Sequence, residues 1–347
     1  MRRSGRCLLI VLAGCGYGIA EPDSGRSGDS AEAGGLPSEL LAPPDAFPWA
    51  DRFTVEPDRG LAWARDATFE LPGFTVPQLW VASDGTWVMM ASNAADPGGR
   101  WLLTSPDGLA WTPADAAFLA AADFSPLGCG SRLEDGAVLY EPGGSLRLVV
   151  EGIQPIPDDK HAEWRRWCQA VGESGTLWTP DTAAFFFTGA QDDADQPSVP
   201  AALPLADGSQ FLTYVGALYT DDAGIRVATT AGPDWAVSRI SEGSILPVDD
   251  VDPDPVYLAG GGIRLFHTHG KDGGPGYADL RGGVEPEEDV LLIENVQPDC
   301  STPEGDCLLD PAFLHLPDDR LVLYFTWIRT EEDGTILGSI GRAFSTD

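Results

Sequence analysis

The stretch Asp310-Pro-Ala-Phe-Leu-His-Leu-Pro-Asp-Asp-Arg-Leu-Val-Leu-Tyr-Phe325 places two β-prone runs on either side of a tight Asp-Asp turn. This pattern is typical of a β-hairpin. Four earlier segments have the same order of strand, turn and strand, with Asp-Gly or Gly-Gly between the runs: 76–90, 134–150, 199–214 and 252–267. Five copies of one unit, repeated roughly every sixty residues, predict an all-β protein built from five similar sheets.

The two ends of the chain indicate that these sheets close into a ring. The fifth unit stops at Gly341-Arg-Ala-Phe-Ser-Thr-Asp347, where a further turn and a tryptophan are expected. That missing piece occurs near the other end, as Asp58-Arg-Gly-Leu-Ala-Trp63. An N-terminal strand that completes the last sheet leaves few exposed sheet edges. We therefore predict a five-bladed β-propeller over residues 49–347, closed by an N-terminal strand, with one short helix-like stretch at 159–167.

A second motif follows the hairpins. Its clearest copy is Ser105-Pro-Asp-Gly-Leu-Ala-Trp111, and 174–178 and 232–235 are degraded copies. The motif resembles the Asp-box turn of sialidase-type propellers. The resemblance implies that the aspartate holds the turn, that the tryptophan packs between blades, and that both residues are structural.

The hairpins that begin Asp252-Pro and Asp310-Pro resemble the inner strands of five-bladed propellers in glycoside hydrolase families 43 and 32. The resemblance implies that carboxylates from inner strands meet in a central funnel and cleave glycosidic bonds, one of them as general acid. The corresponding positions in the five units are Thr75, Glu134, Val199, Asp252 and Asp310. The first unit therefore lacks the acid that such enzymes carry there.

Two groups of residues are candidates for a site. The candidate funnel acids are Glu134, Asp135, Asp252, Asp254 and Asp310, and the candidate ligand contacts are Arg264, His267, His269 and Trp80. His267 and His269 alternate along a strand, so both imidazoles should lie on one face. A structural alternative is open for the acids, because an Asp at a strand end caps its own backbone. Glu151 and Glu173 are weaker candidates for a proton donor and are expected in solvated loops.

Cysteines and histidines give little sign of a metal site. Besides Cys7 and Cys15 near the N-terminus, the chain has Cys129, Cys168, Cys300 and Cys307, which read as two disulfides in an exported protein. Four cysteines allow three pairings. No Cys-x-x-Cys occurs and the histidines number 4, so we predict neither a zinc site nor another cofactor. The run of aspartates at 249, 250, 252 and 254 carries the oxygens that calcium prefers but lacks the EF-hand pattern, so calcium binding stays a weaker alternative.

The N-terminus reads as an export signal. Three arginines precede a short apolar run, and the segment ends in Leu12-Ala13-Gly14-Cys15. These residues resemble the lipobox of bacterial lipoprotein precursors, which implies cleavage before Cys15 and a lipid on its sulfur. We predict a signal peptide at 1–14, a flexible tether at 15–48, and anchorage in the bacterial cell envelope, with the outer membrane favoured. An ordinary signal peptide cut after Ala20 is the alternative.

Charge limits the partners. The formal net charge is -33, which disfavours binding to nucleic acid. Two functions from different classes fit the sequence. The first is a monomeric, membrane-anchored propeller that binds a glycan or a protein partner, which requires only a rigid scaffold with variable loops. The alternative is a glycoside hydrolase-like enzyme that acts on polysaccharide with its funnel carboxylates.

Overall fold

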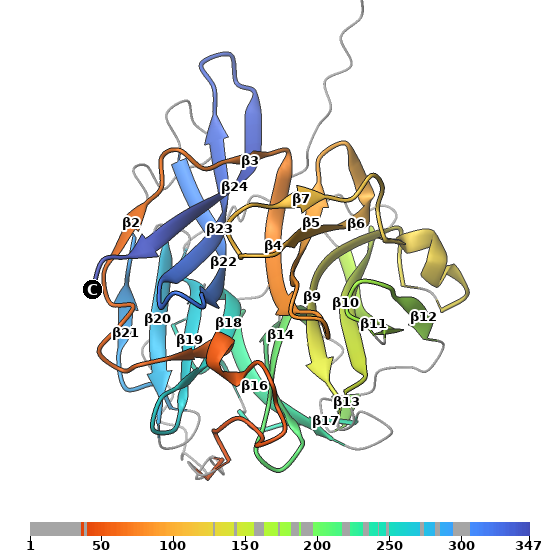
Figure 1. Ribbon diagram of the computed structural model, residues 1–347. Helices are drawn as coiled ribbons and strands as arrows, with labels where there is room; N and C mark the ends of the chain where they lie inside the picture. Colours follow the sequence, from red (N-terminus) through yellow and green to blue (C-terminus); the bar gives the residue numbers. More distant parts are fainter. Residues whose placement is uncertain are drawn as a thin grey trace, which may run out of the picture.

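The structure of the protein is a computed structural model, shown in Figure 1. It describes residues 36–37, 40–127, 129–141, 144–155, 163–172, 174–181, 187–188, 197–216, 223–231, 236–241, 243–247, 250–270, 274–281, 285–293 and 306–347. Within these ranges the regular elements are strands and two short 3₁₀-helices, η1 (Ala50–Phe53) and η2 (Ala121–Leu127). No helix in the described residues is long and apolar enough to cross a membrane. The segment 163–167, expected to be helical, lies instead in a strand.

The strands form five separate sheets, which are the five predicted blades. Blade one contains β4 (Phe74–Val81), β5 (Trp87–Asn93), β6 (Asp96–Ser105), β7 (Thr112–Pro113) and β8 (Leu119–Ala120). Blade two contains β9 (Arg132–Tyr140), β10 (Leu146–Pro155), β11 (Glu163–Gly172) and β12 (Thr179–Asp181). Blade three contains β14 (Ser198–Pro204), β15 (Gln210–Gly216), β16 (Gly224–Ala231), β17 (Ala236–Arg239) and β13 (Phe187–Thr188).

The last two blades also take up strands from the N-terminal segment. Blade four contains β1 (Thr54–Val55), β18 (Val251–Leu258), β19 (Ile263–Thr268), β20 (Pro275–Leu280) and β21 (Asp289–Leu291). Blade five contains β22 (Asp306–His315), β23 (Leu321–Thr330), β24 (Ile336–Ser345), β2 (Trp63–Arg65) and β3 (Leu71–Pro72). Both sheets therefore join strands that are far apart in the chain.

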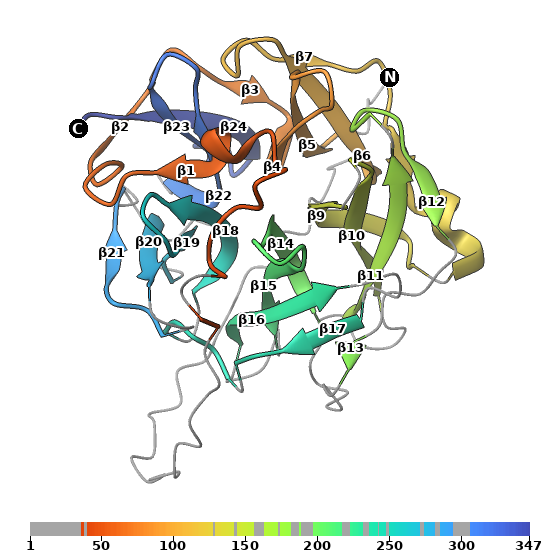
Figure 2. The same ribbon diagram turned by 60° about the horizontal axis from the view of Figure 1, so that its bottom comes forward.

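The five inner strands β4, β9, β14, β18 and β22 gather around the middle of the molecule (Figure 2). Each contacts the inner strand of the next blade, and β22 returns to β4, so the ring is closed. The N-terminal strand β2 pairs antiparallel with the C-terminal strand β24, and Trp63 lies opposite Ser345. The predicted closure is confirmed. Because blades pack face to face, the middle strand β5 is buried on both sides over Trp87 to Ala91, which explains its continuous apolar run.

The segment that precedes the first blade packs across the ring. Leu41, Phe47 and Phe53 are buried in a core cluster with residues of blades one, three, four and five. The Gly262 N–H also donates to the Leu41 carbonyl oxygen (3.0 Å). The flexible tether was expected to extend to residue 48. Its described part at 40–48 instead packs against the propeller, because it carries the large apolar side chains of Leu41 and Phe47.

The turn at 105–111 has the geometry that the Asp-box resemblance implied. The Asp107 Oδ1 accepts hydrogen bonds from the Leu109 N–H (2.8 Å) and the Ala110 N–H (3.0 Å). Trp111 packs edge to face on Tyr324 of blade five, and its ring N–H donates to the Tyr324 hydroxyl (2.9 Å). The motif therefore joins the first blade to the last.

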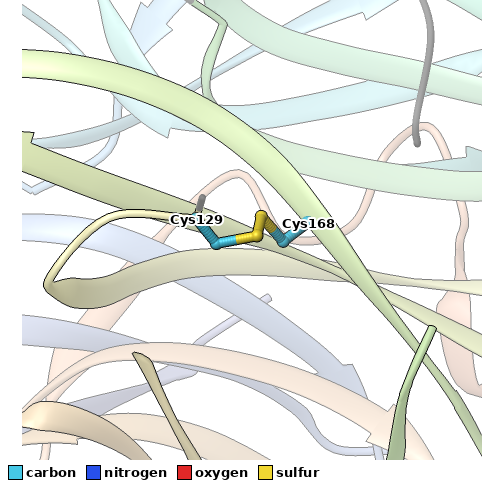
Figure 3. Close-up of a disulfide and its surroundings, with 2 residues drawn as sticks. All are labelled: Cys129 and Cys168. Atoms are coloured by element: carbon cyan, nitrogen blue, oxygen red, sulfur yellow. A yellow bond between two sulfur atoms is a disulfide. The ribbon is translucent and has the colours of Figure 1, made fainter. Parts of the chain in front are cut away.

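A disulfide between Cys129 and Cys168 links the segment before β9 to β11 within blade two (Figure 3). Cys307 at the start of β22 is disulfide-bonded as well. Cys300, the remaining cysteine of the four, lies outside the described residues, as do the predicted signal peptide at 1–14 and Cys15.

Candidate functional site

Each inner strand carries a β-bulge near its start. The bulges lie at or next to the positions that are equivalent in the five repeated hairpins. In four blades the bulge contains a residue with positive φ followed by proline: Val76 (55°), Val199 (46°), Asp252 (56°) and Asp310 (51°). In blade two the bulge contains Glu134 and Asp135. The left-handed conformation is costly for a residue with a branched side chain, so the repeated bulge is a strained feature held by the ring.

The bulge corrects one sequence-based assignment. The blade-one residue equivalent to Asp252 and Asp310 is Val76, because it carries the positive φ and precedes the proline. Thr75 had been expected at that position, but it still pairs with Ser92 in the regular ladder. Blade one therefore contributes a valine, and the absence of an acid at this position holds.

The bulges surround a central cavity of about 60 Å³. All five inner strands line it. Its carboxyl groups are Asp135, Asp252, Asp254 and Asp310, and its aromatic side chains are Phe53, Trp80 and Tyr140. The cavity has room for a few water molecules, since each needs roughly 10 to 15 Å³. It is well below the ~300 Å³ of a pocket that encloses a small-molecule ligand.

Asp252 and Asp310 form a hydrogen-bonded pair of carboxyl groups from adjacent blades. Burial raises the pKa of both, and the nearby Asp252 charge raises that of Asp310 further. The Asp252 Oδ2 also accepts hydrogen bonds from the Thr268 hydroxyl (2.7 Å) and the Asp310 backbone N–H (3.4 Å). These donors favour the charged form of Asp252, so the shared proton belongs mainly to Asp310.

Asp135 faces the same cavity from blade two. Burial raises its pKa well above the ordinary value, and the carboxylates of Glu151 and Glu134 raise it further. Its Oδ1 accepts a hydrogen bond from the Gln78 side-chain amide (2.9 Å). The guanidinium of the buried Arg100 donates to the Gln78 Oε1 (2.9 Å), so Gln78 is held between a cation and an acid. The environment of Asp135 therefore favours the protonated, neutral form of its carboxyl group.

Asp254 is the fourth acid of the cavity. Burial raises its pKa to about 7, although its Oδ2 accepts a hydrogen bond from the Phe313 N–H (2.7 Å). That bond ties the acid of blade four to the inner strand of blade five. Asp254 therefore changes its charge close to neutral pH.

Glu134 does not line the cavity. It pairs with Arg132 (Nε to Oε1, 2.8 Å) and lies 3.6 Å from the Arg165 guanidinium. Arg165 also pairs with Glu151, which is fully buried on β10 and accepts a hydrogen bond from the Ser198 hydroxyl (2.9 Å). The prediction of a solvated Glu151 was wrong. The residues around Glu151 in the sequence do not indicate that it is paired, because its buried ion-pair partner Arg165 comes from the next strand.

The other candidate ligand contacts lie away from the cavity or are already bonded. Arg264 is buried and forms a two-pronged ion pair with Asp279, with Nε to Oδ1 at 2.7 Å and Nη2 to Oδ2 at 3.0 Å. Trp80 touches the cavity, but its ring N–H donates to the Gly175 carbonyl oxygen (2.8 Å) between blades one and two. His267 and His269 form a separate group with acids of blade four.

The aspartate run considered for calcium is divided between these places. Asp250 lies beside His267, Asp252 and Asp254 line the central cavity, and residue 249 is outside the described part. The described members of the run therefore do not form one site. Glu173, the other weak candidate for a proton donor, also lies outside the described residues.

Comparisons with known proteins identify the fold. No family model matches the sequence, and no curated protein matches it. A thermostable family-43 glycoside hydrolase matches with a TM-score of 0.56 and 13% identity, over 78% of this chain and 89% of that one. An endo-1,4-β-xylanase from Bacteroides thetaiotaomicron matches with a TM-score of 0.52 and 15% identity, over 77% and 94% of the two chains.

A xylan β-1,4-xylosidase from Bacillus halodurans also matches, with a TM-score of 0.52 and 12% identity, over 77% of this chain and 55% of that one. At such low identity these likenesses establish a shared five-bladed propeller. The chemistry of this chain has to be argued from its own cavity.

Proposed function

We propose that this protein is a glycoside hydrolase-like enzyme that acts on a polysaccharide at its central cavity. The observation that carries the proposal is that three blades bring Asp135, Asp252 and Asp310 to one cavity in unequal environments. Glycoside hydrolysis requires one protonated and one charged carboxyl group on either side of the scissile bond. Asp135 has the environment of the protonated group, and the Asp252–Asp310 pair supplies the charged group.

In this proposal Asp135 donates its proton to the glycosidic oxygen as the bond from that oxygen to the anomeric carbon breaks. A water molecule attacks the anomeric carbon and gives its proton to the Asp252–Asp310 pair. Gln78 holds the Asp135 carboxyl through its amide. The cavity volume of about 60 Å³ admits only part of a sugar, so a chain end or a single ring edge would enter while the rest of the glycan lies outside.

Hydrolysis assays on xylan, arabinan and aryl glycosides test the proposal. We expect Asp135→Asn and Asp310→Asn to lower the rate by roughly 10² to 10⁴-fold, the usual contribution of a general acid or base. Asp207→Asn is the matched control, because Asp207 is an exposed acid in the blade-three hairpin. Release of no sugar from any substrate, or equal rates in parent and Asp135→Asn, would refute hydrolysis.

A second candidate function is glycan binding without cleavage. The small cavity favours it, as does the presence of Val76 and Val199 at two of the five equivalent positions. A glycan array separates the two functions. Binding with no hydrolysis, and with affinity unchanged in Asp310→Asn, would favour the binding propeller.

We also propose that the chain is held in the bacterial cell envelope by a lipid on Cys15. The proposal rests on the Leu12-Ala13-Gly14-Cys15 lipobox and the arginines before it. Several acyl chains anchor a protein firmly, at about 0.8 kcal/mol for each buried CH₂. A Cys15→Ala variant should move from the membrane to the soluble fraction. An unchanged membrane fraction would contradict the anchor.

A further inference from the structure

A group of four side chains in blade four lies apart from the central cavity. Asp250 stands just before β18, His267 and His269 lie in and after β19, and Asp289 begins β21. The His267 Nε2 is 3.1 Å from the Asp289 Oδ1, and the His269 Nε2 is 3.3 Å from the Asp289 Oδ2. Three strand segments of one sheet thus converge on this group, and Figure 1 shows β18, β19 and β21 in one blade.

Two polar atoms of the group are buried without a partner. Asp250 is 1% exposed and His267 is 0% exposed. Among the described residues, the Asp250 Oδ2 and the His267 Nδ1 have no hydrogen-bond partner. They lie 3.9 Å from each other, which is too far for a hydrogen bond. Buried polar groups are normally paired, so these two atoms are available to bind a ligand.

The geometry of the group suits a metal ion. One ligand atom from each of Asp250, His267 and Asp289 lies within 4.8 Å of the others. Ligands of a tetrahedral zinc ion are about 2.0 to 2.2 Å from the metal and hence roughly 3.4 Å from one another. The Gly270 N–H donates to the Asp250 Oδ1 (2.7 Å), which fixes that carboxyl and directs its other oxygen to the group.

The donor set selects the kind of metal. Two imidazoles with two carboxylates suit zinc and similar transition metals, whereas calcium is bound by oxygen ligands alone. The His269 side chain is 36% exposed, so an ion can enter from that side. We propose that Asp250, His267 and Asp289 bind one divalent transition-metal ion, such as Zn²⁺, that joins three strands of blade four. The partly exposed His269, which lies beside Asp289, turns its side chain to supply the fourth ligand. The sequence led us to expect no zinc site, because the chain has few histidines. It could not show that two of these histidines lie beside two acids in the folded protein.

Metal binding by the purified full chain tests the site. After treatment with a chelator, we expect the parent to bind one equivalent of Zn²⁺ in equilibrium dialysis, and its melting temperature to rise by several degrees on binding. Co²⁺ should bind at the same site with a visible absorption band typical of a low-coordinate ion. Ca²⁺ should give no such effects. Because neither readout involves glycans, the result is independent of the proposed hydrolysis.

Variants locate the ion. His267→Ala should abolish stoichiometric binding. His269→Ala changes a partly exposed side chain and should fold, with an affinity at least tenfold lower than that of the parent. His315→Ala is the matched control, since His315 lies in blade five and interacts with Asp319 (3.1 Å). No stoichiometric Zn²⁺ in the parent, or equal affinity in His269→Ala and His315→Ala, would overturn the proposal.

Discussion

At the scale of single residues, the main feature is a set of buried carboxyl groups whose pKa values the fold raises. Burial raises the pKa of Asp254 to about 7, whereas an unfolded aspartate has a value near 3.8. Between these two values the unfolded chain releases a proton that the folded protein keeps. The free energy of unfolding therefore falls as the pH rises from about 4 to 7, and this loss is complete above the folded pKa.

We expect Asp254→Asn to remove this contribution. An asparagine can still accept the Phe313 N–H, but it does not titrate. The variant should match the parent near pH 4 and exceed it in free energy of unfolding by about 1 to 3 kcal/mol above pH 7. Denaturant unfolding across this range measures the difference, with Asp207→Asn as control. A constant difference at every pH would show that Asp254 is charged in the folded protein.

Four of the five acids predicted to meet do line the cavity, whereas Glu134 does not, and the environment of these acids was not predicted. Repeated hairpins aligned Asp252 with Asp310 because the repeat preserves position along each strand. In blade one, the residue equivalent to Asp252 and Asp310 is Val76 and not Thr75. The sequence could not show this, because a valine before proline gives no sign of the left-handed conformation. The contact between Arg100 and Gln78, which holds Asp135, could not be predicted either. Arg100 reaches Gln78 from two strands further along blade one.

At the scale of elements, the N-terminal turn of the last blade is completed by the C-terminus. In the turn at 58–63, Arg59 stands where Asp107 stands in the first turn, so the local sequence offers no carboxylate at that position. The structure assigns the role of Asp107 to Asp347, whose carboxylate accepts the N–H groups of Gly60 (2.9 Å), Leu61 (2.8 Å) and Ala62 (3.1 Å). An acid distant in sequence thus replaces a local one, and local motif reading could not find it.

We expect Asp347→Ala to lower the free energy of unfolding by about 1 to 2 kcal/mol, because three N–H groups lose a charged acceptor. Burial raises the pKa of Asp347, but the hydrogen bonds from Ser345 and the turn outweigh it, and the pKa lies below its ordinary value. The stabilisation should therefore be present at neutral pH and be lost as the pH falls through that lowered pKa. Asp45→Ala, an equal change of charge at an exposed residue, should have little effect. Equal stability of both variants at neutral pH would contradict the role of Asp347.

At the scale of the whole molecule, the ring is held by segments that cross between blades. The strand β2 completes blade five, β1 pairs parallel with β18 of blade four, and the segment before them covers the inner strands. The repeats predicted five blades and their closure, because those follow from a recurring hairpin and a displaced tryptophan. The covering segment escaped prediction because its polar composition concealed a few large apolar residues, among them Leu41 and Phe47.

Leu41 provides the test of this covering segment. It is 0% exposed within a cluster that joins several blades, so its truncation should leave a cavity where they meet. We expect Leu41→Ala to lower the free energy of unfolding by about 2 to 5 kcal/mol. Leu177→Ala is the matched control, because that side chain is 78% exposed and should tolerate the same truncation. Denaturant unfolding measures both, and similar midpoints for the two variants would show that the ring is stable without its N-terminal cover.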